Sequence, residues 1–152
     1  MKAQTRLFGE IDIGEDKIIT FKDGMIGLPE YKRYTLIYDL DKKDTGMIKW
    51  LQSLDDKDVA FPVIDPSLVI KGYEPFLDLD ILSDDEDVKA DNIIVLVTLT
   101  APKDITKLSV NLRAPIFINS STLNAAQCIQ NDNSFPIKYY IYDIIKPESK
   151  TE

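Results

Sequence analysis

Carboxylates are the most numerous side chains in this sequence that could do chemistry, and they gather in one stretch. Residues 74–91 hold eight acidic residues and one lysine, a net charge of −7 against −8 for the whole chain. The eight are Glu74, Asp78, Asp80, Asp84, Asp85, Glu86, Asp87 and Asp91. Three chemistries use clustered carboxylates: acid–base catalysis, calcium binding and electrostatic attraction of a basic partner.

Catalysis finds little support in the residue types. Paired carboxylates can hydrolyse glycosidic bonds, but among 26 acidic residues such pairs arise by chance. The sequence has no histidine, which excludes Ser-His-Asp and Cys-His nucleophile systems. Its single cysteine, Cys128, lies in an apolar stretch that predicts a buried, unreactive thiol. We therefore predict that the protein is not an enzyme.

Calcium binding would need oxygen ligands at alternating loop positions, a glycine at the turn and a closing glutamate. Asp78 and Asp80 alternate but lack the glycine, and the consecutive residues 84–87 do not all point at one centre. We therefore predict no cofactor and no dedicated metal site. A small carbohydrate- or calcium-binding β module stays open as the alternative function.

Apolar residues are interleaved with the acidic ones, among them Tyr73, Phe76 and Leu77. An acidic run is often only a solvated loop, and that interpretation also stays open. Apolar neighbours would instead tether the carboxylates to a folded surface, which suits a basic protein partner and speeds its association. Because negative charge repels phosphate backbones, we expect no direct nucleic-acid binding.

The elements that position these residues are predicted to be mainly β. Short runs rich in Ile, Val, Thr, Phe and Tyr recur between turn residues. The predicted strands cover residues 5–13, 17–21, 34–40, 47–51, 59–64, 92–100, 108–112, 116–119, 125–129 and 138–145. Their close spacing favours a small, single-domain, β-barrel-like fold with few short helices. The helix candidates are Pro29–Arg33 and Pro75–Leu82, which both begin at a proline.

Three local patterns refine this prediction. Residues 93–97 are continuously apolar, as in a strand that is covered on both faces. Phe61-Pro62 places a proline inside a strand pattern, which predicts an edge or a bulge. Gly24 and Gly27 lie in a stretch that predicts a turn with positive φ angles.

The organisation of the chain is simple. We predict one domain over residues 1–146, followed by a flexible C-terminal tail at 147–152. Charges interrupt every short apolar run near the N-terminus, and no apolar run is long enough to span a bilayer. We therefore expect a cytoplasmic protein without membrane contact.

Four segments carry a resemblance to a known family: Phe21–Glu30, Trp50–Asp56, Ala60–Pro66 and Asn111–Asn119. In this order and spacing they resemble the FliW family of flagellar assembly factors, over about Phe8 to Tyr142. The resemblance implies a compact β-barrel-like protein of the bacterial cytoplasm without catalytic activity.

The resemblance also implies two protein partners. One is CsrA, a small basic RNA-binding dimer, which family members antagonise and thereby relieve repression of flagellin translation. The other is newly made flagellin, which sequesters the family member until flagellin is exported.

The candidate partner-binding residues combine both lines of argument. They are Asp55, Asp56, Asp58, Tyr73, Glu74, Phe76, Asp78, Asp80, Asp84, Asp85, Glu86 and Asp87. The carboxylates are predicted to face CsrA, with residues 55–58 contributing if their loop lies beside the 74–91 stretch. Apolar side chains, including those of Tyr73, Phe76, Tyr139, Tyr140 and Tyr142, are candidates for receiving the amphipathic helices of flagellin.

Overall fold

The structure is a computed structural model, and it describes residues 1–37, 48–77, 92–132 and 134–145. Eleven strands occur in these ranges, with one short helix, α1 (Tyr142–Ile145). The strands are β1 (Lys2–Thr5), β2 (Gly9–Asp12), β3 (Ile19–Phe21), β4 (Arg33–Ile37), β5 (Ile48–Ser53), β6 (Ala60–Ile64), β7 (Ile93–Thr100), β8 (Ser109–Val110), β9 (Ile116–Asn119), β10 (Asn124–Gln127) and β11 (Tyr139–Tyr140). Single 3₁₀ turns lie at Glu15–Lys17, Pro66–Leu68 and Ile105–Lys107. The predicted mainly-β class is confirmed.

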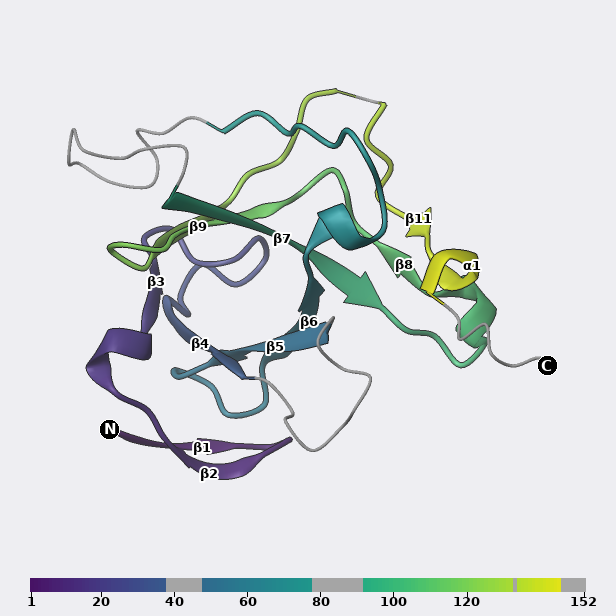
Figure 1. Ribbon diagram of the computed structural model, residues 1–152. Coiled ribbons are helices and arrows are strands. Elements are labelled where there is room, and N and C mark those ends of the chain that lie inside the picture. Colours follow the sequence, from purple (N-terminus) through teal and green to yellow (C-terminus); the bar gives the residue numbers. More distant parts are fainter. Residues whose placement is uncertain (38–47, 78–91, 133, 146–152) are drawn as a thin grey trace.

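Within the described residues, seven strands close into a barrel, which Figure 1 shows nearly end-on. The order around it is β7-β6-β5-β4-β3-β10-β9, and β9 pairs with β7 again to complete the ring. Neighbouring strands are antiparallel except β3 and β10, which are parallel. Closure leaves the barrel without free sheet edges, and the predicted small barrel is confirmed.

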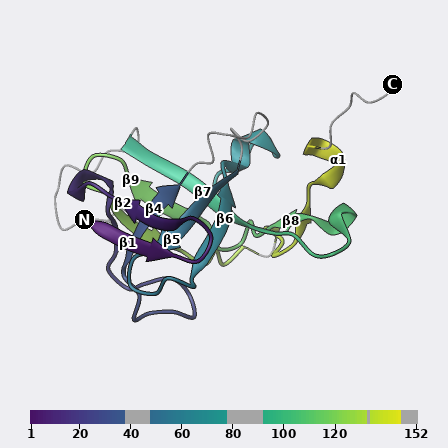
Figure 2. The same ribbon diagram turned by 90° about the horizontal axis from the view of Figure 1, so that it is seen from below.

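The strands β6 and β7 serve two hydrophobic clusters, because successive side chains of a strand point to opposite faces. Val63 and Leu96 are buried inside the barrel, while Ile64 and Val97 are buried in a second cluster outside it. This second cluster belongs to a lobe that carries β8 and α1 and extends beside the barrel (Figure 2). The expectation that residues 93–97 are covered on both faces is confirmed at Leu96 and Val97, whereas Ile94 is 43% exposed.

The predicted single strand over residues 5–13 is wrong, because the chain folds back there as the hairpin β1–β2. Thr5 pairs with Gly9, whose φ of +69° allows the reversal, and the Thr5 hydroxyl accepts a hydrogen bond from the Phe8 N–H. The Phe8 ring contacts the Trp50 ring edge to face, at 6.4 Å between centroids. The hairpin therefore lies outside the barrel, against β4 and β5 (Figure 1).

The predicted helix at Pro29–Arg33 is also wrong. Residues 22–32 form a compact loop that is closed by a hydrogen bond from the Phe21 N–H to the Lys32 carbonyl (2.8 Å). Gly24 has a φ of +71°, and a Cβ there would lie 2.6 Å from the Pro29 Cα, so only glycine fits. This agrees with the turn predicted at Gly24, and β4 begins at Arg33 instead of continuing a helix.

Two more predictions need correction. The predicted strand over residues 138–145 ends at Tyr140, and α1 follows it. The strand that contains Pro62 lies between β5 and β7 and is not an edge strand. The missing N–H of Pro62 costs no hydrogen bond to β7, because the pairing of β6 with β7 covers only Val63 and Ile64.

Candidate partner-binding surface

The loop between β5 and β6 (residues 54–59) is held by its own side chains. The Ser53 hydroxyl accepts hydrogen bonds from the N–H groups of Asp55 and Asp56, both at 3.0 Å. The Asp55 carboxylate accepts the N–H groups of Lys32 (2.9 Å) and Arg33 (3.1 Å) and pairs with the Arg33 guanidinium (2.9 Å). Asp55 therefore ties the loop to the start of β4.

The electrostatics of Asp55 agree with this structural role. Partial burial disfavours its charge, but the hydrogen bonds from Arg33 and Lys32 and the positive guanidinium outweigh that effect. The pKa of Asp55 consequently lies below its usual value. Both of its oxygens bind groups of the protein itself, and the Arg33 guanidinium offsets its negative charge, so Asp55 offers little net charge to a second protein.

The other two acidic residues of the loop are also engaged. Asp56 accepts the N–H of Asp58 (2.9 Å) and the hydroxyl of Tyr31, and these bonds lower the pKa of Asp56. The same contact raises the pKa of the Tyr31 hydroxyl. Asp58 is exposed and pairs with its neighbour Lys57 at 3.4 Å. Asp58 is thus the most accessible of the three carboxylates predicted here.

A second candidate region is the segment 73–77, which follows the 3₁₀ turn after β6. The Tyr73 ring packs edge to face on Phe135 (5.2 Å between centroids), and its hydroxyl donates to the Leu112 carbonyl. Burial raises the pKa of Tyr73 above its usual value. Tyr73 thus anchors the segment to the second cluster, and its predicted part in partner binding stays a prediction.

Phe76 has the opposite environment. Its side chain is 75% exposed, and Glu74 beside it is exposed as well. Its backbone is nevertheless fixed, because the Gln130 side chain accepts the Phe76 N–H (2.7 Å) and donates to the Phe76 carbonyl (2.9 Å). Gln130 itself is 6% exposed, and its N–H donates to the Arg113 carbonyl at 2.7 Å.

Gln130 was missed by the sequence analysis. The signal that could have found it is an amide side chain directly after an apolar stretch, since a buried amide requires hydrogen-bond partners. Its partner, Phe76, lies 54 residues away in the chain, so no local pattern reveals the pair.

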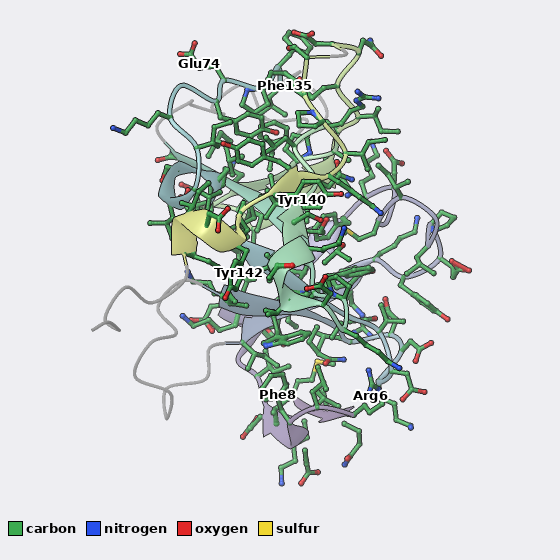
Figure 3. The ribbon with its side chains drawn as sticks, turned by 90° about the vertical axis from the view of Figure 1, so that its right-hand side faces the viewer. Arg6, Phe8, Glu74, Phe135, Tyr140 and Tyr142 are labelled. Carbon is green, nitrogen blue, oxygen red and sulfur yellow. The ribbon has the colours of Figure 1, made fainter. Side chains whose placement is uncertain are left out.

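The structure does not bring the two candidate regions together. The Arg6 N–H donates to the Lys57 carbonyl (3.0 Å), so the β5–β6 loop lies at the hairpin end of the molecule. Figure 3 shows Arg6 at the bottom of the molecule and Glu74 at the top. In Figure 1 the two regions likewise lie below and above the barrel. Residues 55–58 therefore do not extend a surface centred on Glu74.

The remaining predicted carboxylates cannot be located in this way. Asp78, Asp80, Asp84, Asp85, Glu86 and Asp87 lie outside the described residues. The predicted tail at 147–152 lies outside them too, and so does most of the helix predicted over residues 75–82.

Alternation along the strand predicted over residues 138–145 would place Tyr140 and Tyr142 on one face and Tyr139 on the other, but β11 ends at Tyr140. Tyr139 and Tyr142 are both half-buried against the second cluster, whereas Tyr140 is 56% exposed.

Cys128, predicted to be buried, is half-buried. Among the residues that the structure describes, no group of three or more His, Cys, Asp or Glu side chains could hold a metal ion. No helix in these ranges has the length and apolarity needed to cross a membrane.

Fold and surface together define the class of protein: a small closed β-barrel with a second hydrophobic cluster beside it, whose candidate site is a set of exposed side chains on a loop. The sequence model described as "FliW protein" matches residues 2–141. The flagellar assembly factor FliW of Lachnospira eligens is 44% identical over 97% of this chain and 99% of its own length. That of Lachnoclostridium phytofermentans is 41% identical over 100% of this chain and 97% of its own.

A solved structure agrees with these relatives. The crystal structure of a flagellar assembly factor FliW superposes with a TM-score of 0.81 at 27% identity, covering 93% of this chain and 96% of the other. The chain belongs to the FliW family of flagellar assembly factors. This is a family of assembly factors and not one of enzymes, and membership does not favour the carbohydrate- or calcium-binding alternative.

Proposed function

We propose that this chain acts in the bacterial cytoplasm as a protein antagonist of CsrA that also binds flagellin. Binding to CsrA would relieve repression of flagellin translation. Membership of the FliW family supports the proposal at the level of flagellar assembly. The observation that carries the CsrA part is the rigidly held segment 73–77, which exposes Glu74 and Phe76 directly before the most acidic stretch of the sequence.

The mechanism that we propose is electrostatic. An acidic surface docks on the basic dimer and places negative potential near its RNA-binding groove, so RNA phosphates are repelled without being displaced directly. Such repulsion acts over about the Debye length, roughly 8 Å at physiological salt, and falls steeply as salt rises. The acidic stretch should also steer the encounter and raise the association rate.

For flagellin, a groove between β2 and the barrel wall supports the proposal. It encloses about 590 Å³ and is lined largely by apolar side chains. These include Ile11, Ile13, Leu36, Ile37 and Leu123. A groove of this kind suits the apolar face of an amphipathic helix, which is the form expected of the ends of flagellin.

The proposal is tested by measuring binding of purified CsrA and flagellin at low and high salt. A quadruple variant that replaces Asp84, Asp85, Glu86 and Asp87 by lysine should bind CsrA more weakly, mainly through a slower association rate at low salt. The matched control replaces Glu10, Glu15, Asp16 and Asp23, four exposed carboxylates elsewhere, by lysine. It has the same net charge as the test variant and should associate faster than it. Unchanged kinetics of the test variant at low salt would contradict the assignment of CsrA binding to this stretch.

A further inference from the structure

Phe76 combines two properties that seldom occur together. A phenylalanine that is 75% exposed gains little from folding, yet its backbone is held on both sides by one buried side chain. The Gln130 amide offers the Phe76 backbone the acceptor and the donor that a neighbouring strand would offer. A further, longer bond from this amide reaches the Cys128 carbonyl (3.4 Å).

The position of Gln130 is itself fixed by backbone hydrogen bonds next to the sheet. Beyond β10, the Cys128 N–H donates to the Pro115 carbonyl (3.0 Å) and the Gln130 N–H to the Arg113 carbonyl (2.7 Å). The backbone at Phe76 is therefore held through Gln130 to the segment 113–115, which leads into β9. An exposed aromatic side chain on a fixed backbone loses less conformational entropy on binding than one on a free loop.

Charge indicates what kind of partner would receive this ring. Glu74 is exposed two residues before Phe76, and Asp78 and Asp80 follow it in sequence. The exposed negative charge of Glu74, together with the acidic sequence that follows Phe76, favours a partner with a basic surface and an apolar recess.

We propose that Phe76 is the apolar anchor of the interface with a basic protein partner, and that Gln130 is the residue that positions it. This inference rests on the proposed function, in which the basic partner is CsrA. Aromatic residues that enter a pocket of the partner dominate the energetics of many interfaces. The anchor acts after encounter, so it governs dissociation, while the carboxylates govern association.

The experiment measures the kinetics of CsrA binding to variants of the full chain. Phe76→Ala should weaken binding at least about tenfold through faster dissociation, by the same factor at low and high salt. Phe76→Tyr, which keeps the ring, should stay within about threefold of the original chain. The control Tyr140→Ala removes an aromatic side chain of similar exposure (56%) from β11 and should change affinity less than twofold.

Gln130 is tested by a double-variant cycle. Gln130→Ala should weaken binding about threefold to tenfold, and the double variant with Phe76→Ala should bind no more weakly than Phe76→Ala alone. If the two factors multiply instead, Gln130 acts through general stability and its positioning role is overturned. Gln130→Met keeps the length of the side chain without hydrogen bonds to Phe76 and without a buried charge, so it serves if Gln130→Ala does not fold, and a similar loss is expected.

The outcomes separate this inference from the proposed function. If the original chain binds CsrA and Phe76→Ala binds equally well, the anchor is wrong while the proposed function stands. If the original chain does not bind CsrA at all, the proposed function fails. Thermal melting of each variant shows that a loss of binding is not a loss of folding, and Phe76→Ala should melt as the original chain does, because the side chain is exposed.

Discussion

The β5–β6 loop (residues 54–59) and the segment 73–77 are both surface connections with acidic residues, but they use their polar groups in opposite ways. In the loop, Asp55 and Asp56 bind donors within the protein, so the side chains hold the backbone. In the segment, a side chain from elsewhere, Gln130, holds the backbone, and Phe76 and Glu74 are left exposed. A carboxylate that is paired with a guanidinium, as Asp55 is with Arg33, offers a partner less net negative charge than an exposed carboxylate does.

The two acidic regions also differ in where they lie in the molecule. The β5–β6 loop precedes β6 and the segment 73–77 comes after it, and the two regions lie at opposite ends of the molecule (Figure 3). Residues 54–59 should therefore contribute to stability and little to CsrA binding. Within residues 73–77 we expect Tyr73 to contribute to stability and Phe76 to contribute to binding.

The largest effect on stability is expected from Asp55→Ala. It removes the acceptor for the N–H groups of Lys32 and Arg33 and breaks the ion pair with the Arg33 guanidinium, which should cost about 2 kcal/mol of unfolding free energy. Urea denaturation measures this loss. Asp58→Ala, in the same loop, should change stability by less than about 0.5 kcal/mol, because its ion pair is exposed. Equal losses of unfolding free energy in the two variants would show that Asp55 stabilises the loop no more than Asp58 does.

A smaller effect is expected from Tyr73→Phe. The substitution keeps the ring contact with Phe135 but loses the bond from the hydroxyl to the Leu112 carbonyl, which should cost about 1 kcal/mol. CsrA affinity should not change, since the hydroxyl points into the protein. Tyr140→Phe is the control in the exposed position, and urea denaturation should find it as stable as the original chain. Weaker CsrA binding by Tyr73→Phe would place Tyr73 in the interface after all.

The smallest effect concerns acid stability. The pKa of Asp55 is lowered in the folded protein, so its contribution is present above the unfolded pKa of about 3.9 and is lost as pH falls through the folded value. Stability should thus be nearly constant above about pH 5 and decline below about pH 4. Asp55→Asn should make this decline shallower, as measured by urea midpoints from pH 3 to 7. Identical slopes for Asp55→Asn and the original chain would show that Asp55 does not contribute.

The fold could be predicted largely from the sequence, because alternation of apolar residues is a local signal. The strands near residues 17–21 and 59–64 lie close to their predicted places. Errors arose where a turn carried only weak local signals, as at Thr5–Gly9, or where a strand pattern continued into a helix after Tyr140.

The candidate site could be predicted less well, because its parts meet over long distances in the chain. The donors that satisfy Asp55 come from residues 22 and 23 positions away, and Gln130 holds Phe76 across 54 positions. Composition identified Phe76 and the acidic stretch as candidates. It could not show that Tyr73 faces inward and Phe76 outward, because that difference depends on Phe135 and Gln130.

The central claim is that the partner binds at the Glu74 end of the molecule and not at the β5–β6 loop. It is tested most directly by comparing the CsrA affinities of two single charge reversals, Glu74→Lys and Asp58→Lys, at low salt. Both side chains are exposed, and both substitutions change the net charge by the same amount. We predict that Glu74→Lys weakens binding several-fold and that Asp58→Lys changes it less than twofold. Equal effects, or a larger effect of Asp58→Lys, would contradict the claim.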